Sequence, residues 1–244
     1  MDEEDIGTFD EKDLASAESI KFDKIADEKK TDDKKDTKKL LISMAIIIAC
    51  FIIAFAVVRF VKESDVVTIE DLHRMNIEGK ESDINYMYNG YSFVKYGGLW
   101  YTQVQNEKGT LFDIPLHYGP KELEDIVVAG DITEEFLKQS LYITFDPLGS
   151  TLQYVALSSA ELSLSLVNGF GLEPIAACDK NETSACATRP IISSCKDDKA
   201  VVYLREAEKI SVVMNGNCVM LQGEGEGIVK ATDRFLLRLY SIMK

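Results

Sequence analysis

Histidine is scarce in this sequence: only His73 and His117 occur among its 244 residues. Neither lies in an H-E-x-x-H zinc motif, and no G-x-S-x-G nucleophile elbow is present. The sequence therefore predicts no catalytic, cofactor-binding or metal-binding residues, and it leaves enzymatic activity open. His117, at the end of a predicted strand, is a candidate general base, but an ordinary hydrogen-bonded surface histidine is the simpler interpretation.

Basic residues are also in the minority. The chain has 27 Lys and Arg against 41 Asp and Glu, which gives a net charge of −14. Nucleic-acid binding needs a basic surface that replaces phosphate counterions, so this balance argues against a nucleic-acid partner.

Charge disappears altogether over residues 40–58, where Ser43 is the single polar residue. Nineteen helical residues span about 28 Å, close to the ~30 Å hydrocarbon core of a bilayer. The sequence predicts a transmembrane helix over 40–61, through which the chain binds the lipid bilayer.

Lysines near this run set the expected orientation. The 20 residues before the run carry many lysines, whereas the 20 after it carry only Arg59, Lys62 and Arg74. Positive residues favour the cytoplasmic side, so residues 1–39 are predicted to form a disordered charged cytoplasmic tail. The protein is then a single-pass protein of the cell membrane, with its C-terminal domain outside. A cleaved signal peptide ending at Ala54-Phe55-Ala56 is the alternative, but the segment before the run is 39 residues long and acidic overall, unlike a signal peptide.

Five cysteines are present, and Cys50 lies in the apolar run. The other four, Cys178, Cys186, Cys195 and Cys218, are predicted to form two disulfides in an oxidising compartment, with three pairings open. Structural zinc sites usually bring ligands in closely spaced pairs, which these spacings lack, so zinc and free buried cysteines are the alternatives. Asn181 opens the sequon Asn-Glu-Thr and is a candidate glycosylation site.

The rest of the chain predicts an α+β fold: the membrane helix, a polar connector at 62–90, and one globular domain at 91–244 of antiparallel hairpins packed with a few helices. A meander of alternating strands is expected at 91–95, 99–105 and 110–117, with Pro115 placing the third strand at an edge. Asn215-Gly216 predicts a hairpin turn that sets Val213 opposite Cys218. Helices are expected at 120–126, 131–139, 150–169 and 228–243, and strands at 141–145 and 201–205.

The third of these helices carries two further expectations. Ser150 is predicted to cap it and Asn168-Gly169 to close it, although the alternation at 162–166 leaves a strand open there. The face predicted to pack on the sheet consists of Leu152, Val155, Ala156, Ser159 and Ala160.

Three further features each have a functional and a structural interpretation. Lys230, Arg234 and Arg238 recur every four residues on the last helix and could contact a partner, or simply be a solvated face. The glycine-rich 223–227 superficially resembles a phosphate loop, but its two glutamates would repel phosphate, which favours a connector. The aromatic residues between 86 and 101 are expected to pack in the core, or to bind a peptide, a glycan or the membrane surface where they are exposed.

The cysteine-bearing segment IAACDKNETSACATRPIISSC, the strand VVYL, the hairpin MNGNCVMLQG and the final DRFLLRLYSIM resemble a group of uncharacterised archaeal single-span membrane proteins. The likeness covers the last ~70 residues best, and the meander less. It implies an anchored, outward-facing four-cysteine domain and nothing about chemistry.

Together these features predict a membrane-anchored, disulfide-linked module that acts by binding an envelope protein or glycan. The alternatives are a membrane-tethered hydrolase of envelope polymers, with carboxylates such as Asp113 or Asp146, and a thiol redox sensor that uses Cys178 and Cys218.

Overall fold

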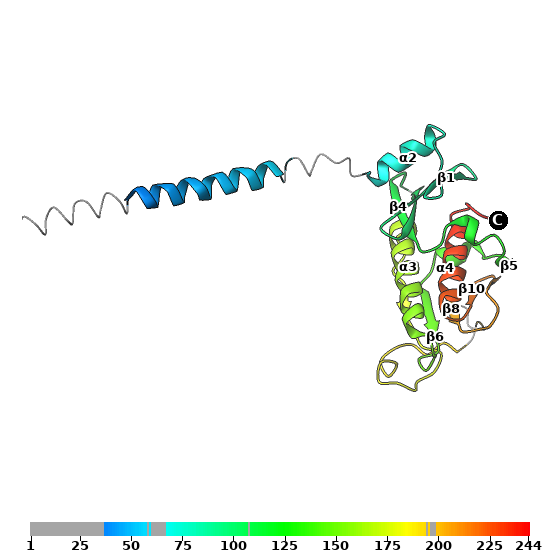
Figure 1. Cartoon of the computed structure of the whole chain (residues 1–244). Coiled ribbons are helices and arrows are strands. Elements are labelled where there is room, and N and C mark those ends of the chain that lie inside the picture. The colour runs from blue at the N-terminus through cyan, green and yellow to red at the C-terminus, as the bar shows by residue number, and fades with distance from the viewer. Residues whose placement is uncertain (1–36, 58, 60–66, 107, 194, 196–198) are drawn as a thin grey trace, which may run out of the picture. The chain divides into compact units, whose positions relative to one another are not determined.

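The computed structural model describes residues 37–57, 59, 67–106, 108–193, 195 and 199–244 (Figure 1). The chain divides into two units, 1–66 and 67–244. Most of the predicted tail lies outside the described residues. Within the first unit a helix runs over Thr37–Val57, with a mean hydropathy of 3.1 and none of its most apolar window buried. The described part of the chain thus contains one helix long and apolar enough to cross a membrane, and it begins three residues before the predicted 40.

The second unit begins with an antiparallel sheet that confirms the predicted meander. Its strands, β1(Asn85–Tyr88), β2(Tyr91–Tyr96), β3(Leu99–Gln105) and β4(Leu111–Leu116), lie in sequence order. β4 is an edge strand, as expected from Pro115, which cannot donate to a neighbouring strand. Ile114 and Leu116 are buried on one face of β4 while Leu111 and Asp113 are exposed on the other.

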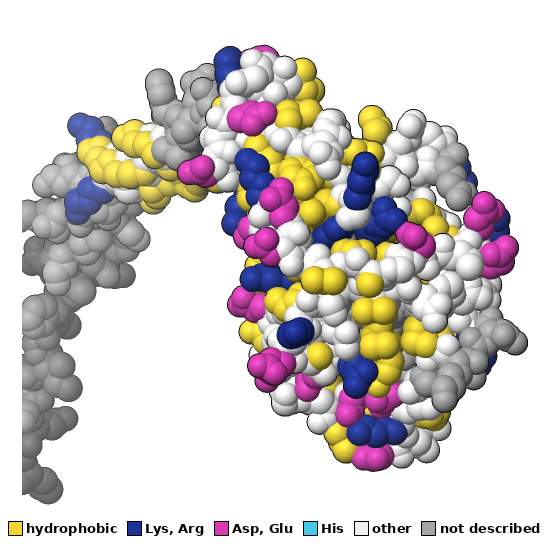
Figure 2. Space-filling model, turned by 90° about the vertical axis from the view of Figure 1, so that its right-hand side faces the viewer, with side chains coloured by type: hydrophobic (Ala, Val, Ile, Leu, Met, Phe, Trp, Pro, Cys, Tyr) yellow, Lys and Arg dark blue, Asp and Glu magenta, His cyan; other side chains and the backbone are white. Residues whose placement is uncertain are grey.

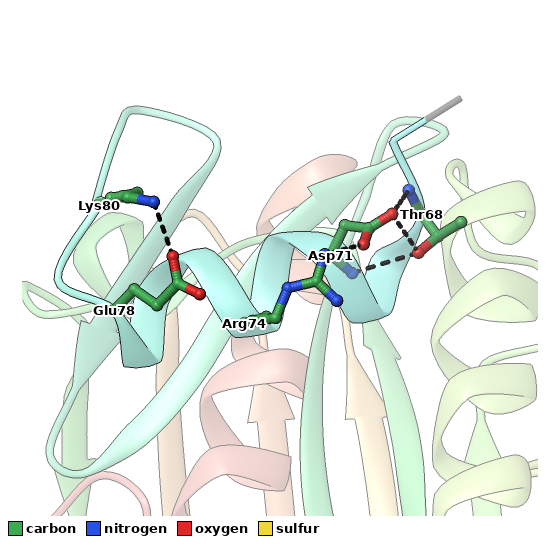
Figure 3. A network of polar contacts seen from close by, with 5 residues as sticks. All are labelled: Thr68, Asp71, Arg74, Glu78 and Lys80. Atoms are coloured by element: carbon green, nitrogen blue, oxygen red, sulfur yellow. Dashed lines mark hydrogen bonds and ion pairs between the residues drawn. The ribbon is translucent and has the colours of Figure 1, made fainter. Parts of the chain in front are cut away.

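The folded unit also takes in much of the predicted 62–90 connector, which is a correction. The helix α2(Ile69–Ile77) packs against β1 and β2. Its start has a capping box: the Asp71 N–H donates to Thr68 Oγ1 at 3.2 Å, and the Thr68 N–H donates to Asp71 Oδ2 at 3.1 Å (Figure 3). Asn76 is buried, and its amide donates to the backbone oxygens of Tyr86 and Phe93. The stretch resembles a linker in sequence because two of the three buried side chains of α2, His73 and Asn76, are polar and find hydrogen-bond partners only after folding.

The second sheet is mixed, with strand order β5-β9-β10-β8-β6-β7. Only β9 and β10 pair antiparallel; the other neighbours are parallel. The α+β class is confirmed, but local hairpin signals did not indicate the parallel pairs, which join segments far apart in the sequence. The strands are β5(Val127–Ala129), β6(Leu141–Phe145), β7(Ile175–Ala176), β8(Ala200–Arg205), β9(Ser211–Asn215) and β10(Cys218–Gln222).

The β9–β10 hairpin differs from its prediction in register. Asn215 pairs with Cys218, and Val213 pairs with Met220 rather than with Cys218. The two turn residues are Gly216 and Asn217, because Gly216 adopts a positive φ of 62° and the Asn217 side chain accepts a hydrogen bond from Thr133 Oγ1 at 2.6 Å.

Two long helices, α3(Leu152–Phe170) and α4(Glu226–Leu239), lie side by side, and α4 contacts β9 and β10 (Figure 1). The predicted helices at 120–126 and 131–139 are short 3₁₀ turns, η1(Pro120–Glu122) and η2(Glu134–Leu137). The helices α3 and α4 pack into a core that also contains residues of both sheets. The largest fully buried side chains are Phe93, Phe136, Phe235, Ile114, Leu116, Leu123, Leu141, Leu162, Leu166, Ile192, Leu204 and Leu221.

The ends of α3 differ from their predictions. Ser150 does not cap the helix; instead the Glu206 carboxylate accepts the N–H groups of Ser150 and Thr151 at 3.1 and 2.7 Å. The helix continues through 162–166 and past Gly169, ending at Gly171, whose φ is 65°. Gly169 has another role, since a Cβ there would lie 2.2 Å from the Tyr240 hydroxyl.

The buried face of α3 is also a correction. Leu152, Ala156 and Ala160 are exposed, whereas Val155, Ser158, Glu161, Leu162, Ser165, Leu166 and Gly169 are buried. The buried face thus includes a glutamate, which an analysis of apolar periodicity places toward solvent.

Candidate functional site

The most unusual group in the folded unit is Asp233, a carboxyl that is fully buried in α4. Its Oδ2 accepts the backbone N–H groups of His117 and Tyr118 at 3.0 and 2.8 Å. These two residues follow β4 directly, so the carboxyl links the end of the edge strand to the middle of α4. A carboxylate can replace the missing sheet partner of such N–H groups.

A second buried carboxyl lies beside it. Glu161 of α3 is 7% exposed and hydrogen-bonds His117 Nδ1. Burial raises the pKa of Glu161 to about 8. Burial, together with the nearby Glu161 carboxyl, raises the pKa of Asp233 well above its usual value. Two such acids cannot both be ionised at neutral pH, so the pair keeps at least one proton.

His117 completes this group at the surface, with its side chain 32% exposed. Burial lowers its pKa, so the ring is neutral near pH 7. A protonated acid beside a neutral histidine is able to transfer protons, but neither Glu161 nor Asp233 lines either of the cavities described below. The arrangement therefore positions β4, α3 and α4 relative to one another. For His117 it favours the interpretation as an ordinary hydrogen-bonded histidine over that of a general base.

A pH dependence of stability follows from the buried pair. The pKa of Glu161 rises from 4.5 to about 8 on folding. The folded state therefore holds more protons, and stability present below pH 4.5 is lost as the pH rises through 8. Glu161→Gln replaces the carboxyl by an uncharged amide of the same shape. We expect it to reduce the loss of the free energy of unfolding with rising pH, as measured by urea unfolding between pH 5 and 9. His117, whose pKa is lowered, acts in the opposite sense below about pH 6.5, so His117→Gln serves as the control. An unchanged slope in Glu161→Gln would show that Glu161 is ionised in the folded state.

The carboxylates proposed for a hydrolase do not come together. Asp113 is exposed on β4 of the antiparallel sheet, whereas Asp146 follows β6 of the mixed sheet and pairs with Lys180 at 2.9 Å. Among the cavities described here, none is lined by either residue. Asp113 and Asp146 therefore do not form the pair of carboxylates in a cleft that glycoside hydrolysis needs.

The three basic residues of α4 do not form one exposed stripe, which is a correction. Lys230 places its ammonium 4.8 Å from the centre of the Tyr118 ring, and Arg238 pairs with Asp131 at 2.6 Å. Arg234 is only 5% exposed. The face in Figure 2 correspondingly mixes basic, acidic and apolar side chains rather than presenting a basic surface. A role of Lys230, Arg234 and Arg238 in partner contact stays a prediction, and it cannot be that of a single solvated patch.

Arg234 instead lines a cavity of about 520 Å³. The cavity combines the β1–β2 turn, the stretch after η1 and the end of the chain after α4; its polar lining residues are Tyr88, Asn89, Glu124, Arg234, Ser241 and Lys244. Sequence analysis missed this site because its residues come from three segments. The one indication in the sequence was that Arg234 lies beside the apolar stripe of the last helix, next to Phe235 and Leu239.

A second cavity, of about 300 Å³, lies between α3 and the edge of the mixed sheet. Ile143, Phe145 and Ala156 give it an apolar wall, and Arg189 is among the residues that line it. Its volume is at the lower end of the range for small-molecule sites.

The four cysteines form the pairs Cys178–Cys186 and Cys195–Cys218, so the predicted disulfides are present in one of the three pairings. Cys178 and Cys218 belong to different disulfides, and a redox pair between them is not formed. The described residues include no group of three His, Cys, Asp or Glu able to hold a metal ion. Asn181 is exposed in the loop closed by Cys178–Cys186, where a glycan has access to it.

The structure also shows where the glycine-rich segment 223–227 and the aromatic cluster lie. The segment 223–227 leads into α4, whose first residue, Glu226, accepts the Tyr118 hydroxyl at 2.9 Å. A carboxylate in the first turn of the helix repels a phosphate there, which agrees with a connector. In the aromatic cluster, Tyr86, Phe93 and Trp100 are buried and the Tyr86 ring contacts the other two, as expected of core packing, whereas Tyr96 is exposed.

A scan against protein-family models finds no matching family, and searches of curated proteins and of solved structures return no match. The likeness to archaeal single-span proteins therefore stays a prediction.

Proposed function

We propose that this chain is a single-pass membrane protein whose folded unit lies outside the cytoplasm and acts as a binding or assembly component of the cell envelope. The observation that carries the proposal is the combination of an exposed apolar helix, Thr37–Val57, with two disulfides in the folded unit.

The helix supports a membrane anchor because none of the described residues of its own unit covers its apolar surface. Its 21 residues span about 31 Å, which matches the bilayer core. Large side chains such as Phe51 and Phe55 are more than two-thirds exposed. Each such side chain costs about 1.5–3 kcal/mol in water, so an apolar helix of this length is stable only when lipid or another apolar surface covers it.

The disulfides support the outer location, because reduced thiols are the normal state in the cytoplasm. The lysine-rich segment before the helix supports the same orientation independently, since positive residues are retained on the cytoplasmic side. An envelope protein or a glycan is then the partner within reach of the folded unit.

Binding is favoured over catalysis by how the polar groups are placed. Glu161 and Asp233, the two carboxyls with the most altered pKa values, are buried in the packing between elements, whereas Arg234 and Arg189 line cavities. Charged groups at cavities and buried acids in the interior suit a module that recognises a ligand without transforming it.

A topology experiment tests the proposal on the full chain. In intact cells, externally added protease is expected to digest the folded unit, and membrane-impermeant maleimide is expected to label Cys178, Cys186, Cys195 and Cys218 only after an external reductant is added. The matched control is Ser16→Cys in a Cys50→Ala chain, whose tail thiol should react only after the cells are permeabilised. Maleimide labelling of the four cysteines from the cytosolic side, without reductant, would contradict the proposal.

A further inference from the structure

The cavity of about 300 Å³ between α3 and the edge of the mixed sheet is lined by apolar and small side chains. Its floor is the sheet. Ile143 of β6 pairs with Ala176 of β7, so their side chains lie on the same face, and Phe145 follows two residues along β6. The opposite wall is one face of α3, made of three small residues at helical spacing: Ala156, Ser159 and Ser163. These short side chains leave space between the helix and the sheet edge.

The two serine hydroxyls of this wall have already used their hydrogens. Ser159 Oγ donates to the backbone oxygen of Val155 at 2.8 Å, and Ser163 Oγ donates to that of Ser159 at 2.7 Å. A sugar or another polyol needs several hydrogen-bond partners when it leaves water, and this lining offers few. The cavity therefore favours a ligand that is mostly hydrocarbon.

Arg189 is the only ionisable residue among the described residues that line this cavity. Its side chain is exposed and forms no ion pair in the described part of the chain, so its charge is available to a ligand. The Arg189 N–H donates to the oxygen of Cys186 at 3.1 Å, and the Cys178 N–H donates to the oxygen of Pro190 at 3.0 Å. Because Cys178 and Cys186 form a disulfide, the loop that carries Arg189 is tied to the sheet edge beside β7.

We propose that this cavity binds a short aliphatic carboxylate, with its alkyl chain against Ile143, Phe145 and Ala176 and its carboxylate on Arg189. A planar guanidinium holds a carboxylate through two parallel N–H···O bonds, and one negative charge neutralises the single positive charge of the lining. At ~30 Å³ for each water, the cavity has room for about ten waters or a similar number of ligand atoms other than hydrogen. An aliphatic acid of about six to eight carbons has this size.

This inference names a ligand class for the binding function proposed above and rests on that function for its biological setting. The full chain in uncharged detergent micelles is titrated with hexanoate, butanoate and hexanol by ligand-observed NMR, with empty micelles as the blank. We expect hexanoate to bind with a Kd of about 1 mM. Butanoate should bind about tenfold more weakly because it buries two fewer methylenes, and hexanol about five- to tenfold more weakly because it has no charge for Arg189.

Two pairs of matched variants locate the site. Arg189→Gln should weaken hexanoate binding about five- to tenfold and leave hexanol binding unchanged, whereas Arg205→Gln, at an exposed arginine of β8, should change neither. Ala156→Leu should weaken both ligands at least tenfold because the longer side chain enters the cavity, whereas Ala160→Leu, on α3 but outside the lining, should change neither. All four residues are exposed, so each variant is expected to keep the fold.

Absence of hexanoate binding, equal affinities for hexanoate and hexanol, or unchanged hexanoate binding in Arg189→Gln or Ala156→Leu would each overturn the inference. These outcomes differ from failure of the proposed function. Protease and maleimide access report where the folded unit lies, whereas the titration reports what its cavity holds.

Discussion

Asp233→Ala is expected to lower the free energy of unfolding by about 3–5 kcal/mol, because it leaves two buried N–H groups without an acceptor at about 1–3 kcal/mol each. Those N–H groups belong to His117 and Tyr118, at the end of an edge strand. No other strand is available to accept them, since β4 pairs only with β3. The methyl group also leaves a small cavity between β4 and α4.

Asp233→Asn is the matched control. The amide oxygen of the asparagine can still accept both N–H groups. The substitution also removes a carboxyl whose pKa is raised by burial. We expect a change of less than about 1.5 kcal/mol. Urea unfolding of the full chain in micelles, followed by the fluorescence of Trp100, measures both variants. Trp100 is the only tryptophan, is buried, and donates from Nε1 to Glu122 at 2.9 Å. Equal stabilities for the alanine and asparagine variants would show that Asp233 is not the acceptor that holds this junction.

Removal of both disulfides is expected to cost about 6 kcal/mol, which is comparable to the whole stability of a typical domain. The chain-entropy relation gives about 2.5 kcal/mol for Cys178–Cys186, with a separation of 8, and about 3.4 kcal/mol for Cys195–Cys218, with a separation of 23. The longer loop contributes more because it excludes more conformations of the unfolded chain. Cys195–Cys218 also ties the segment before β8 to the first residue of β10, at the centre of the mixed sheet.

Paired Cys→Ser variants, made one disulfide at a time, test this order by urea unfolding. Cys50→Ala is the control, because Cys50 is exposed on the apolar helix and forms no disulfide. It should leave the stability of the folded unit unchanged. If the Cys178/Cys186 pair costs more than the Cys195/Cys218 pair, contacts in the folded state rather than chain entropy dominate the contribution of these disulfides.

The sequence by itself determined the features that depend on short stretches or on chemistry independent of neighbours. The uncharged run predicted the apolar helix, because about 20 apolar residues have the length of a bilayer core. The four cysteines after it predicted disulfides. Alternating side chains predicted β2, β3 and β4, and Pro115 predicted that β4 lies at an edge, because a residue without an N–H cannot donate to a neighbouring strand.

Only the tertiary structure decided the features that join distant segments. The parallel pairs β6–β8 and β8–β10 carry no local turn signal, so nothing near those strands indicates their order in the sheet. The sequence of α2 is as polar as a linker, and its burial depends on the hydrogen bonds that Asn76 donates to the backbone of β1 and β2.

The same reason explains the candidate site. Glu161 and Arg234 are ionisable residues that helical periodicity places toward water, yet both are buried in the fold. Burial of an ionisable group depends on partners that come together only on folding: His117 for Glu161, and the Lys244 oxygen, beyond the end of α4, for Arg234. A sequence pattern records the polarity of a side chain, whereas its free energy in the folded protein depends on which distant groups replace the water around it.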